Sequence, residues 1–273
     1  MKSLLPNDLN PVQLQTILQT SIAPRPIALA STIDEEGNAN LSPFSFFNMF
    51  STVPPILIFS PSRRVRDKTT KHTLENILQV PEVTIGIVNY DIVQQISLAS
   101  TEYDKGVNEF IKSGLTAIES DIIKPKLIKE CPVNFECKVI EVKPLGEEGG
   151  AGNLVICEVL KIHIDEKYLN EEGNLDQKKL DLVARLGSNW YSRNNTNNLF
   201  EVPKPLTTKG IGYDQLPQQI KGSTIISGND LGMLANVERL PDGNFSASEK
   251  THHIAKEYLA AMDIESAWNV LII

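Results

Sequence analysis

Residues 24–60 constrain the fold more than any other part of the chain. The run Pro-Arg-Pro-Ile-Ala-Leu-Ala-Ser-Thr begins at residue 24, and a second apolar run, Pro-Pro-Ile-Leu-Ile-Phe-Ser, ends at residue 60. Between them, Asp34-Glu-Glu-Gly-Asn38 separates two apolar stretches, which is typical of a hairpin turn. The segment therefore predicts a strand, a tight turn, a second strand, a bend and a buried third strand.

The bend at residues 42–48 mixes small hydroxyl side chains with three phenylalanines, Phe44, Phe46 and Phe47. A planar heteroaromatic ring with hydrogen-bonding edges needs that combination of polar groups and aromatic surface. Barrel core or subunit contacts are a strong alternative explanation for the phenylalanines. The bend is therefore a candidate binding segment.

The rest of the chain adds further strands and short helices. Residues 83–88 form an apolar run, residues 133–139 alternate apolar and polar side chains, and residues 154–164 form a long final strand after the turn at Glu147-Glu-Gly-Gly150. About six strands separated by short helices predict a mainly β fold, a closed or nearly closed antiparallel barrel. The sequence Val202-Pro-Lys-Pro205 marks a boundary, which gives a barrel domain at 1–205 and a C-terminal extension at 206–273 with one helix at about 248–262.

Charge and cysteine content exclude several classes of protein. The net charge of -8 argues against a nucleic-acid-binding surface, and no apolar stretch approaches the roughly 20 residues that span a bilayer. The N-terminus lacks a signal-peptide core, so we expect a cytoplasmic protein. Cys131, Cys137 and Cys157 lie in apolar, strand-like runs and are interpreted as small buried side chains, without a disulfide framework or a metal site.

Familiar catalytic signatures are missing from the sequence. It has no Gly-x-Gly-x-x-Gly after a strand, no P-loop, no His-Glu-x-x-His and no Gly-x-Ser-x-Gly. No catalytic residue is assigned for this reason, and a cofactor is expected to supply the reactivity. A helix predicted from Lys71 to Val80, with Thr73 as its N-cap, follows a loop that contains Arg63, Arg64 and Arg66. Free amides at the helix start beside basic side chains suit an anion, although a capped helix next to a solvated loop explains the same residues.

Five segments together carry a resemblance to a known family. They are Ile22-Ala-Pro-Arg-Pro-Ile-Ala28, Ser42-Pro-Phe-Ser-Phe-Phe-Asn48, Gly114-Leu-Thr116, Cys131-Pro-Val-Asn-Phe-Glu-Cys137 and Val183-Ala-Arg-Leu-Gly187. With the order of elements in residues 24–60, they resemble the flavin reductase-like family, specifically its longer, flavoredoxin-like members. The resemblance implies an FMN-binding split barrel that forms a homodimer, with the flavin near the subunit interface.

The resemblance also assigns cofactor-binding residues. Members usually carry Lys-Asp-Thr where this chain has Lys71-His72-Thr73, and that segment grips the FMN phosphate; His72 is the departure. Residues Ser42, Pro43, Phe44 and Ser45 would face the polar edge of the flavin, Asn48 its ring or ribityl chain, and Thr32 and Ser60 the ribityl and phosphate. Arg25 is either a phosphate or ring partner or part of a structural ion pair. The segments 185–187 and 190–191 could close over the flavin or pack between barrel and extension.

The implied activity is hydride transfer from NADH or NADPH to FMN, with the reduced flavin passed to a partner monooxygenase or another acceptor. Three alternatives remain open. They are a flavin-binding electron carrier or sensor that does not turn over NAD(P)H, a split-barrel oxidase acting on pyridoxine phosphate, and a barrel that has lost its flavin.

Overall fold

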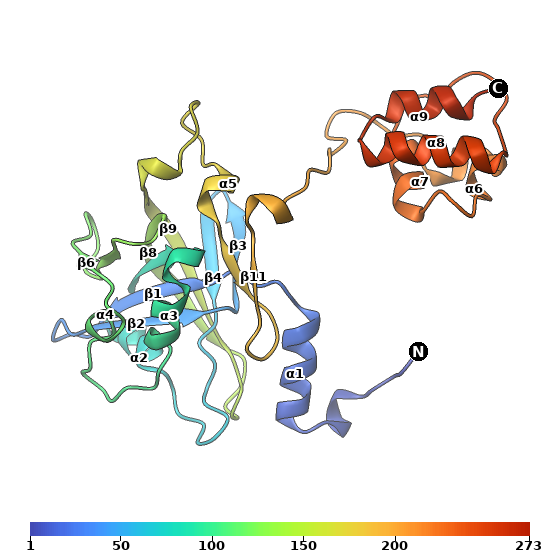
Figure 1. The fold of residues 1–273 in the computed structure, drawn as a ribbon. Coiled ribbons are helices and arrows are strands. Elements are labelled where there is room, and N and C mark those ends of the chain that lie inside the picture. Colours follow the sequence, from blue (N-terminus) through green and yellow to red (C-terminus); the bar gives the residue numbers. More distant parts are fainter. The chain divides into compact units, whose positions relative to one another are not determined.

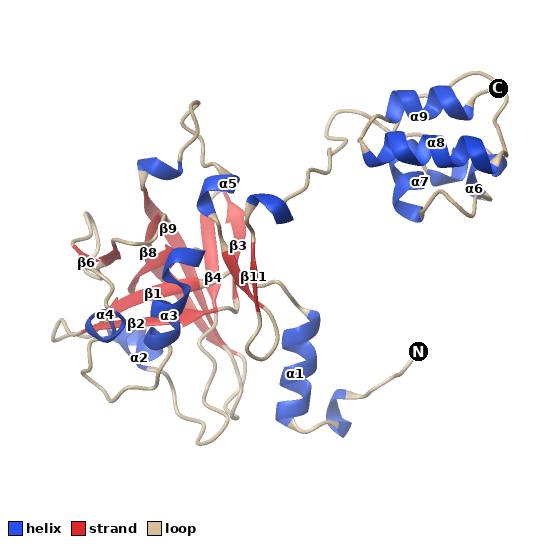
Figure 2. Cartoon of the chain, in the orientation of Figure 1, coloured by secondary structure: helices blue, strands red, loops and turns tan.

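A computed structural model describes residues 1–273, which divide into two compact units, Met1–Leu199 and Phe200–Ile273 (Figure 1). The first unit is built around an antiparallel sheet, and the second is helical (Figure 2). No helix of the structure is both long enough and apolar enough to cross a bilayer.

The sheet of the first unit has seven strands in the order β2-β1-β5-β8-β9-β4-β3. Its strands are β1 (Ala28–Ile33), β2 (Ala39–Phe44), β3 (Phe47–Thr52), β4 (Pro55–Phe59), β5 (Glu82–Ile87), β8 (Val133–Pro144) and β9 (Asn153–Ile164). The two edge strands, β2 and β3, follow each other in the chain, but no ladder joins them. The sheet is therefore open. The prediction of a mainly β, antiparallel fold is confirmed, whereas the strand number of six and the closed or nearly closed barrel were wrong.

The additional strand is β3, which begins at the end of the predicted bend, at Phe47. It pairs with β4 from Phe47↔Phe59 to Thr52↔Pro55, with a register shift between Met49 and Ser51. None of its residues is fully buried. Because the strand lacks a buried face, its sequence Phe-Asn-Met-Phe-Ser-Thr shows no clean alternation of polar and apolar side chains, which is the signal that reveals a half-buried strand.

The predicted hairpin is confirmed. Six residue pairs join β1 to β2, from Ala28↔Phe44 to Ile33↔Ala39. The turn between them is closed by the Asp34 amide, which donates to the Asn38 carbonyl at 3.2 Å. Gly37 has a φ of +85°, a conformation that favours glycine. The turn therefore forms where the acidic and glycine-containing sequence predicted it.

Short helices and strands surround the sheet. They are α1 (Pro11–Ser21), α2 (His72–Gln79), α3 (Val93–Ala99), α4 (Glu109–Ser113), α5 (Gln177–Leu180), β6 (Ala117–Ile118), β7 (Leu127–Ile128), β10 (Val183–Arg185) and β11 (Tyr191–Arg193). Helix α1 begins with a capping box, in which Asn10 Oδ1 accepts from the Gln13 amide at 2.9 Å. Asparagine at the N-cap followed by proline at the first helical position is the usual chemistry of a helix start.

Two apolar clusters share strand β1, whose six residues are all buried. Ala28 and Ala30 pack into one cluster with Phe59 and helix α2, whereas Leu29 packs into the other with helices α3 and α4. Burial on both faces explains why β1 reads as a continuous apolar run. The three cysteines are free and buried, as predicted, and burial raises the pKa of the Cys137 thiol to about 12.

The second unit has its own core, formed by helices α6 (Gln218–Lys221), α7 (Gly228–Leu234), α8 (Glu249–Ala260) and α9 (Ile264–Leu271). Trp268 lies at the centre of this core and packs edge-on against Phe245, with 5.8 Å between ring centroids. Only α8 corresponds to the helix expected at about 248–262. The other three helices have four to eight residues each, too short to show a clear helical period in the sequence.

Candidate functional site

A small polar cavity lies where helix α2 begins, beside strand β2 and the segment that follows α3. It brings together four of the residues predicted to bind the cofactor, Ser42, Lys71, His72 and Thr73. Further side chains on its wall come from Asn40, Arg64, Ser100, Thr101, Glu102, Tyr103 and Glu109. The cavity volume is about 30 Å³, so the cavity can take only one end of a larger ligand.

Lys71 is the cation of this cavity that has no carboxylate partner. Its ammonium lies 5.6 Å from the centre of the Phe44 ring and forms no ion pair. Burial, and then the nearby charge of Arg64, lower the pKa of Lys71, because both disfavour the charged form. An anion next to Lys71 would favour the charged ammonium and so offset the effects of burial and of Arg64.

The basic loop before α2 neutralises most of its other charges internally. Arg64 and Arg66 both pair with Glu102, at 3.0 and 3.2 Å, and Lys68 pairs with Glu148 at 2.6 Å. The predicted excess of positive charge is therefore concentrated at Lys71 and at Arg63, whose Nε is buried without a hydrogen-bond partner.

The start of α2 has no side-chain cap. Lys71 occupies the N-cap position with extended backbone angles, and the predicted cap, Thr73, lies inside the helix. The Thr73 hydroxyl instead donates to Asn40 Oδ1 at 2.7 Å. The prediction that Thr73 caps the helix was wrong, because strand β2 offers this hydroxyl a closer acceptor. The first amides of α2 thus lack a capping side chain. These free amides, together with the unpaired ammonium of Lys71, favour an anion at this position.

Glu109 and Asn40 hold this arrangement in place, and sequence reasoning missed both. One carboxylate oxygen of Glu109 accepts from Asn40 Nδ2 at 2.9 Å, and the other accepts from the Leu41 amide at 3.0 Å. The pKa of Glu109 is raised by burial, which these hydrogen bonds only partly offset. No local pattern marks Glu109, because it meets β2 only through a contact between residues 68 positions apart.

Two further predicted residues lie just behind the cavity. Thr32 is fully buried in β1, and its hydroxyl accepts from Asn76 Nδ2 at 3.2 Å, which ties α2 to the sheet. Phe44 packs against Phe59 in the core, with ring centroids 5.3 Å apart. Both side chains position the wall of the cavity, and Phe44 also offers its ring to Lys71.

Arg25 is engaged by backbone carbonyls and forms no ion pair. Its guanidinium donates to the carbonyls of Gln19 and Ile22 at 2.5 and 2.6 Å, and to that of Leu186 at 2.8 Å. Burial and the charge of Arg185 lower the pKa of Arg25. A cation at the C-terminal end of α1 also interacts favourably with the helix dipole. Arg25 therefore ties α1 to the segment after β10.

A groove of about 380 Å³ runs between α1 and the turn at 149–150. Arg25 and Phe46 line it, together with Leu14, Leu18 and Val65. Ser45 lies next to this groove, with its hydroxyl 3.5 Å from Arg25 Nε. The polar and aromatic residues of the predicted bend are thus divided between this groove and the cavity at α2.

The remaining predicted residues lie elsewhere. Ser60 Oγ is buried and accepts from the Asn153 amide at 3.1 Å. Asn48 is exposed on β3, beside an apolar groove of about 320 Å³ that also includes Met49 and Ile162. Pro43 pairs with Leu29 across the hairpin. The structure therefore does not bring these three residues to the cavity at α2.

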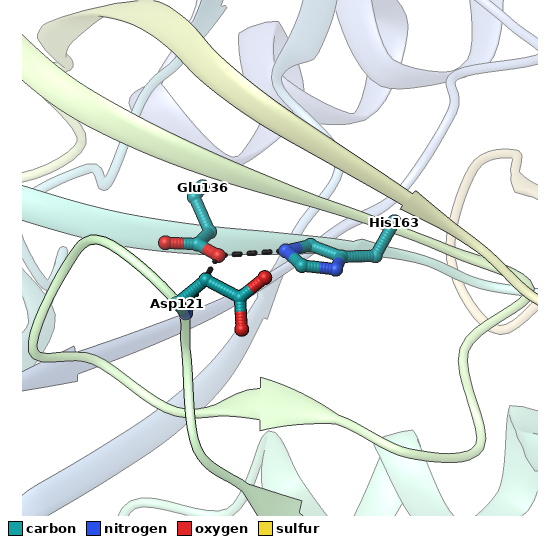
Figure 3. A group of neighbouring side chains, drawn as sticks. All are labelled: Asp121, Glu136 and His163. Atoms are coloured by element: carbon teal, nitrogen blue, oxygen red, sulfur yellow. Dashed lines mark hydrogen bonds and ion pairs between the residues drawn. The ribbon is translucent and has the colours of Figure 1, made fainter.

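A separate cluster of Asp121, Glu136 and His163 has the residue types of a metal site (Figure 3). The carboxylate of Glu136 accepts from three backbone amides, those of Asp121, Ile122 and Ile123, at 2.8–3.1 Å. His163 Nε2 lies 2.6 Å from the same carboxylate, and Asp121 pairs with Lys161. Because these partners already occupy both oxygens of Glu136, the cluster fits an internal hydrogen-bond network that fixes the loop before β7, and it does not fit a metal ion.

Comparison with known proteins places the first unit in a family. Residues 20–181 match the domain family described as flavin reductase like. The chain belongs to the flavin reductase-like family. The matched region contains the cavity at α2 and stops before the second unit.

Individual relatives agree with this membership. An uncharacterized protein of Aquifex aeolicus is 35% identical over 170 residues, which cover 62% of this chain and 84% of the relative. Among solved structures, nitrilotriacetate monooxygenase component B of Bacillus cereus is 29% identical, with a TM-score of 0.68 over 75% of this chain and 98% of its own. A Shewanella frigidimarina protein described as a flavin reductase with a split barrel domain is 27% identical, with a TM-score of 0.62 over 72% and 95%. As a member of this family, the chain is a flavin-related oxidoreductase with an open, mainly β fold.

Proposed function

We propose that this protein binds FMN and that the cavity at the start of α2 holds the FMN phosphate. The observation that carries the proposal is Lys71, a partly buried ammonium without a carboxylate partner beside a helix start without a capping side chain. A phosphate placed there would gain both charge-assisted hydrogen bonds and the favourable end of the helix dipole. Riboflavin, which has no phosphate, would gain neither.

The chain's own residues would then divide the work of binding. Lys71 and the first amides of α2 would hold the phosphate, with Ser42 and His72 on the same wall. Asn40 and Glu109 would keep Thr73 and strand β2 in register with the helix. The Ser45 and Phe46 end of the bend, beside the groove of about 380 Å³, would face the more apolar part of the cofactor.

The proposed reaction is hydride transfer from NADH or NADPH to the bound flavin, which supplies the redox chemistry. No side chain needs to act as acid or base in such a step, so the protein's contribution is orientation and exclusion of water. The likeness to a monooxygenase component B at 29% identity supports a role as supplier of reduced flavin to a partner enzyme. A flavin-binding electron carrier or sensor that does not oxidise NAD(P)H is the second candidate, because both functions use the same cavity.

The binding proposal is tested by titrating the purified, flavin-free protein with FMN and with riboflavin. A charged contact to phosphate is worth roughly 1.5–3 kcal/mol, so FMN is expected to bind about ten to a hundred times more tightly. Equal dissociation constants would contradict the phosphate site. Steady-state oxidation of NADH and NADPH with saturating FMN then separates the reductase from the electron carrier.

We also propose a homodimer, formed through the apolar face that β3 and β9 expose. Met49 and Phe50 are each 64% exposed and Val53 is 91% exposed, and Ile162 borders the same groove as Met49. Exposed apolar side chains of this kind are typical of subunit interfaces, and a twofold dimer is the commonest way to cover them. Light scattering at micromolar concentration should report twice the chain mass. Met49→Asp should shift the mass toward the monomer, and a wild-type monomer that binds FMN fully would contradict the proposal.

A further inference from the structure

We propose that a second cavity of the first unit, between α3 and the β10–β11 hairpin, binds a small planar carboxylate such as an aromatic acid. The cavity has a volume of about 510 Å³, within the usual range for small-molecule sites. Its wall includes Tyr90, Ser97, Arg185, Tyr191, Ser192 and Arg193. The binding proposal stands apart from the flavin, because it concerns a different cavity.

Of the two arginines at this cavity, only Arg185 lacks a counter-charge. Arg193 pairs with Asp181 through two nitrogens, at 2.6 and 2.9 Å, and its guanidinium lies 3.6 Å from the centre of the Tyr90 ring. Arg185 lies 4.6 Å from the centre of the Tyr191 ring and forms neither an ion pair nor a side-chain hydrogen bond. A guanidinium that stacks on an aromatic ring keeps its N–H groups in one plane, ready for a carboxylate.

The cavity also offers planar surface. The rings of Tyr90 and Tyr191 and the guanidinium groups stacked on them form flat walls. A flat ligand with an oxygen-bearing anionic end would use the walls and the free guanidinium together.

The cavity is adjacent to the proposed phosphate site. Ser100 lies on its wall and on the wall of the cavity at α2. A carboxylate bound at Arg185 would thus lie near the phosphate end of the cofactor, in a cavity of its own.

The experiment is isothermal titration calorimetry of the full chain with benzoate and with benzamide, its neutral isostere, at fixed ionic strength. Benzoate is expected to bind at least about ten times more tightly than benzamide, because only the anion engages the guanidinium. Arg185→Gln should remove that difference, and Arg185→Lys, which keeps the charge but loses the planar fork, should retain part of it. Arg239→Gln is the control for net charge, because Arg239 is 80% exposed and already pairs with Asp242.

Each outcome of the titrations decides the inference. Equal affinity for benzoate and benzamide, or unchanged benzoate binding in both Arg185 variants, would overturn it. Competition between benzoate and FMN would also overturn it, because the cavity would then belong to the flavin. Benzoate binding that is equally strong with and without saturating FMN supports it. FMN affinity itself should be unchanged by Arg185→Gln, so a failure of the FMN titration and a failure of the benzoate titration are distinguishable.

Discussion

Two buried glutamates of the first unit, Glu109 and Glu136, have opposite surroundings. Glu136 accepts from three backbone amides and lies against His163, and these partners outweigh the effect of burial and lower its pKa. Glu109 accepts from one backbone amide and one side-chain amide, and burial raises its pKa. The number of donors therefore decides whether each buried carboxylate is stabilised as an anion.

The same contrast separates a structural cluster from a candidate site. Around Glu136 every charge has a partner within the chain, so the cluster fastens a loop to the sheet. Around Glu109 the cavity contains an ammonium without a carboxylate partner and a helix start without a side-chain cap. Residue types alone would have pointed to the cluster of Asp121, Glu136 and His163 as the functional site. The groups that lack a partner within the chain point to the cavity at α2 instead.

The largest expected effect is on stability, from Glu136→Gln. The amide would turn a donor toward backbone N–H groups and leave at least one of them without an acceptor, which costs about 3 kcal/mol of unfolding free energy. Urea denaturation followed by circular dichroism measures this change. Glu119→Gln serves as the control, because Glu119 is 83% exposed and its pairing with Lys126 is expected to contribute little. A loss below about 1 kcal/mol for Glu136→Gln would contradict the structural role.

The next effect is on binding, from Lys71→Ala. FMN affinity is expected to fall about ten- to a hundredfold because a charge-assisted contact to phosphate is lost, with little change in stability. Fluorescence titration with FMN measures it. Lys68→Ala is the matched control, because Lys68 belongs to the same loop but is 58% exposed and pairs with Glu148. Equal losses in the two variants would mean that the loop attracts FMN only through its general charge.

The pH dependence of stability should differ in sign between the two glutamates. The contribution of Glu136 is present above the unfolded pKa of about 4.5 and is lost as the pH falls through its lower folded pKa. Glu109 has a raised folded pKa, so its contribution is present below about pH 4.5 and is lost as the pH rises through that folded pKa.

Two variants test whether stability changes with pH in these opposite directions. The stability difference between wild type and Glu136→Gln should shrink in acid, whereas the wild type should gain stability relative to Glu109→Gln as the pH falls from neutral toward 4.5. Urea denaturation at a series of pH values measures both differences. Curves that run in parallel for both variants would show that neither carboxyl titrates as its surroundings require.

The smallest expected effect is on FMN binding, from Glu109→Gln. The amide can still accept one of the two hydrogen bonds from β2, so FMN affinity should fall by a few-fold, about 1 kcal/mol or less. A loss as large as that of Lys71→Ala would place Glu109 in direct contact with the ligand. An unchanged affinity would confine its role to the fold.

Sequence alone determined the local elements that have strong, short-range signals. The Asp34–Asn38 turn, the Asn10 cap, the apolar run of β1 and the three buried cysteines all follow from turn chemistry, capping and hydrophobicity within a few residues. The same chemistry, with the resemblance built on segments such as residues 42–48, identified the family. It also selected Lys71, His72 and Thr73, which the structure places on one wall.

Only the tertiary structure decided which side chains are left without partners. Thr73 forms a hydrogen bond with Asn40, and Ser60 forms one with Asn153. Arg25 donates to the carbonyls around α1. Each of these contacts joins different parts of the chain. Strand β3 escaped prediction because its surface is not buried within the unit. A hydrogen bond such as that between Glu109 and Leu41 depends on how the sheet folds against its helices, and no pattern of neighbouring residues encodes that distance.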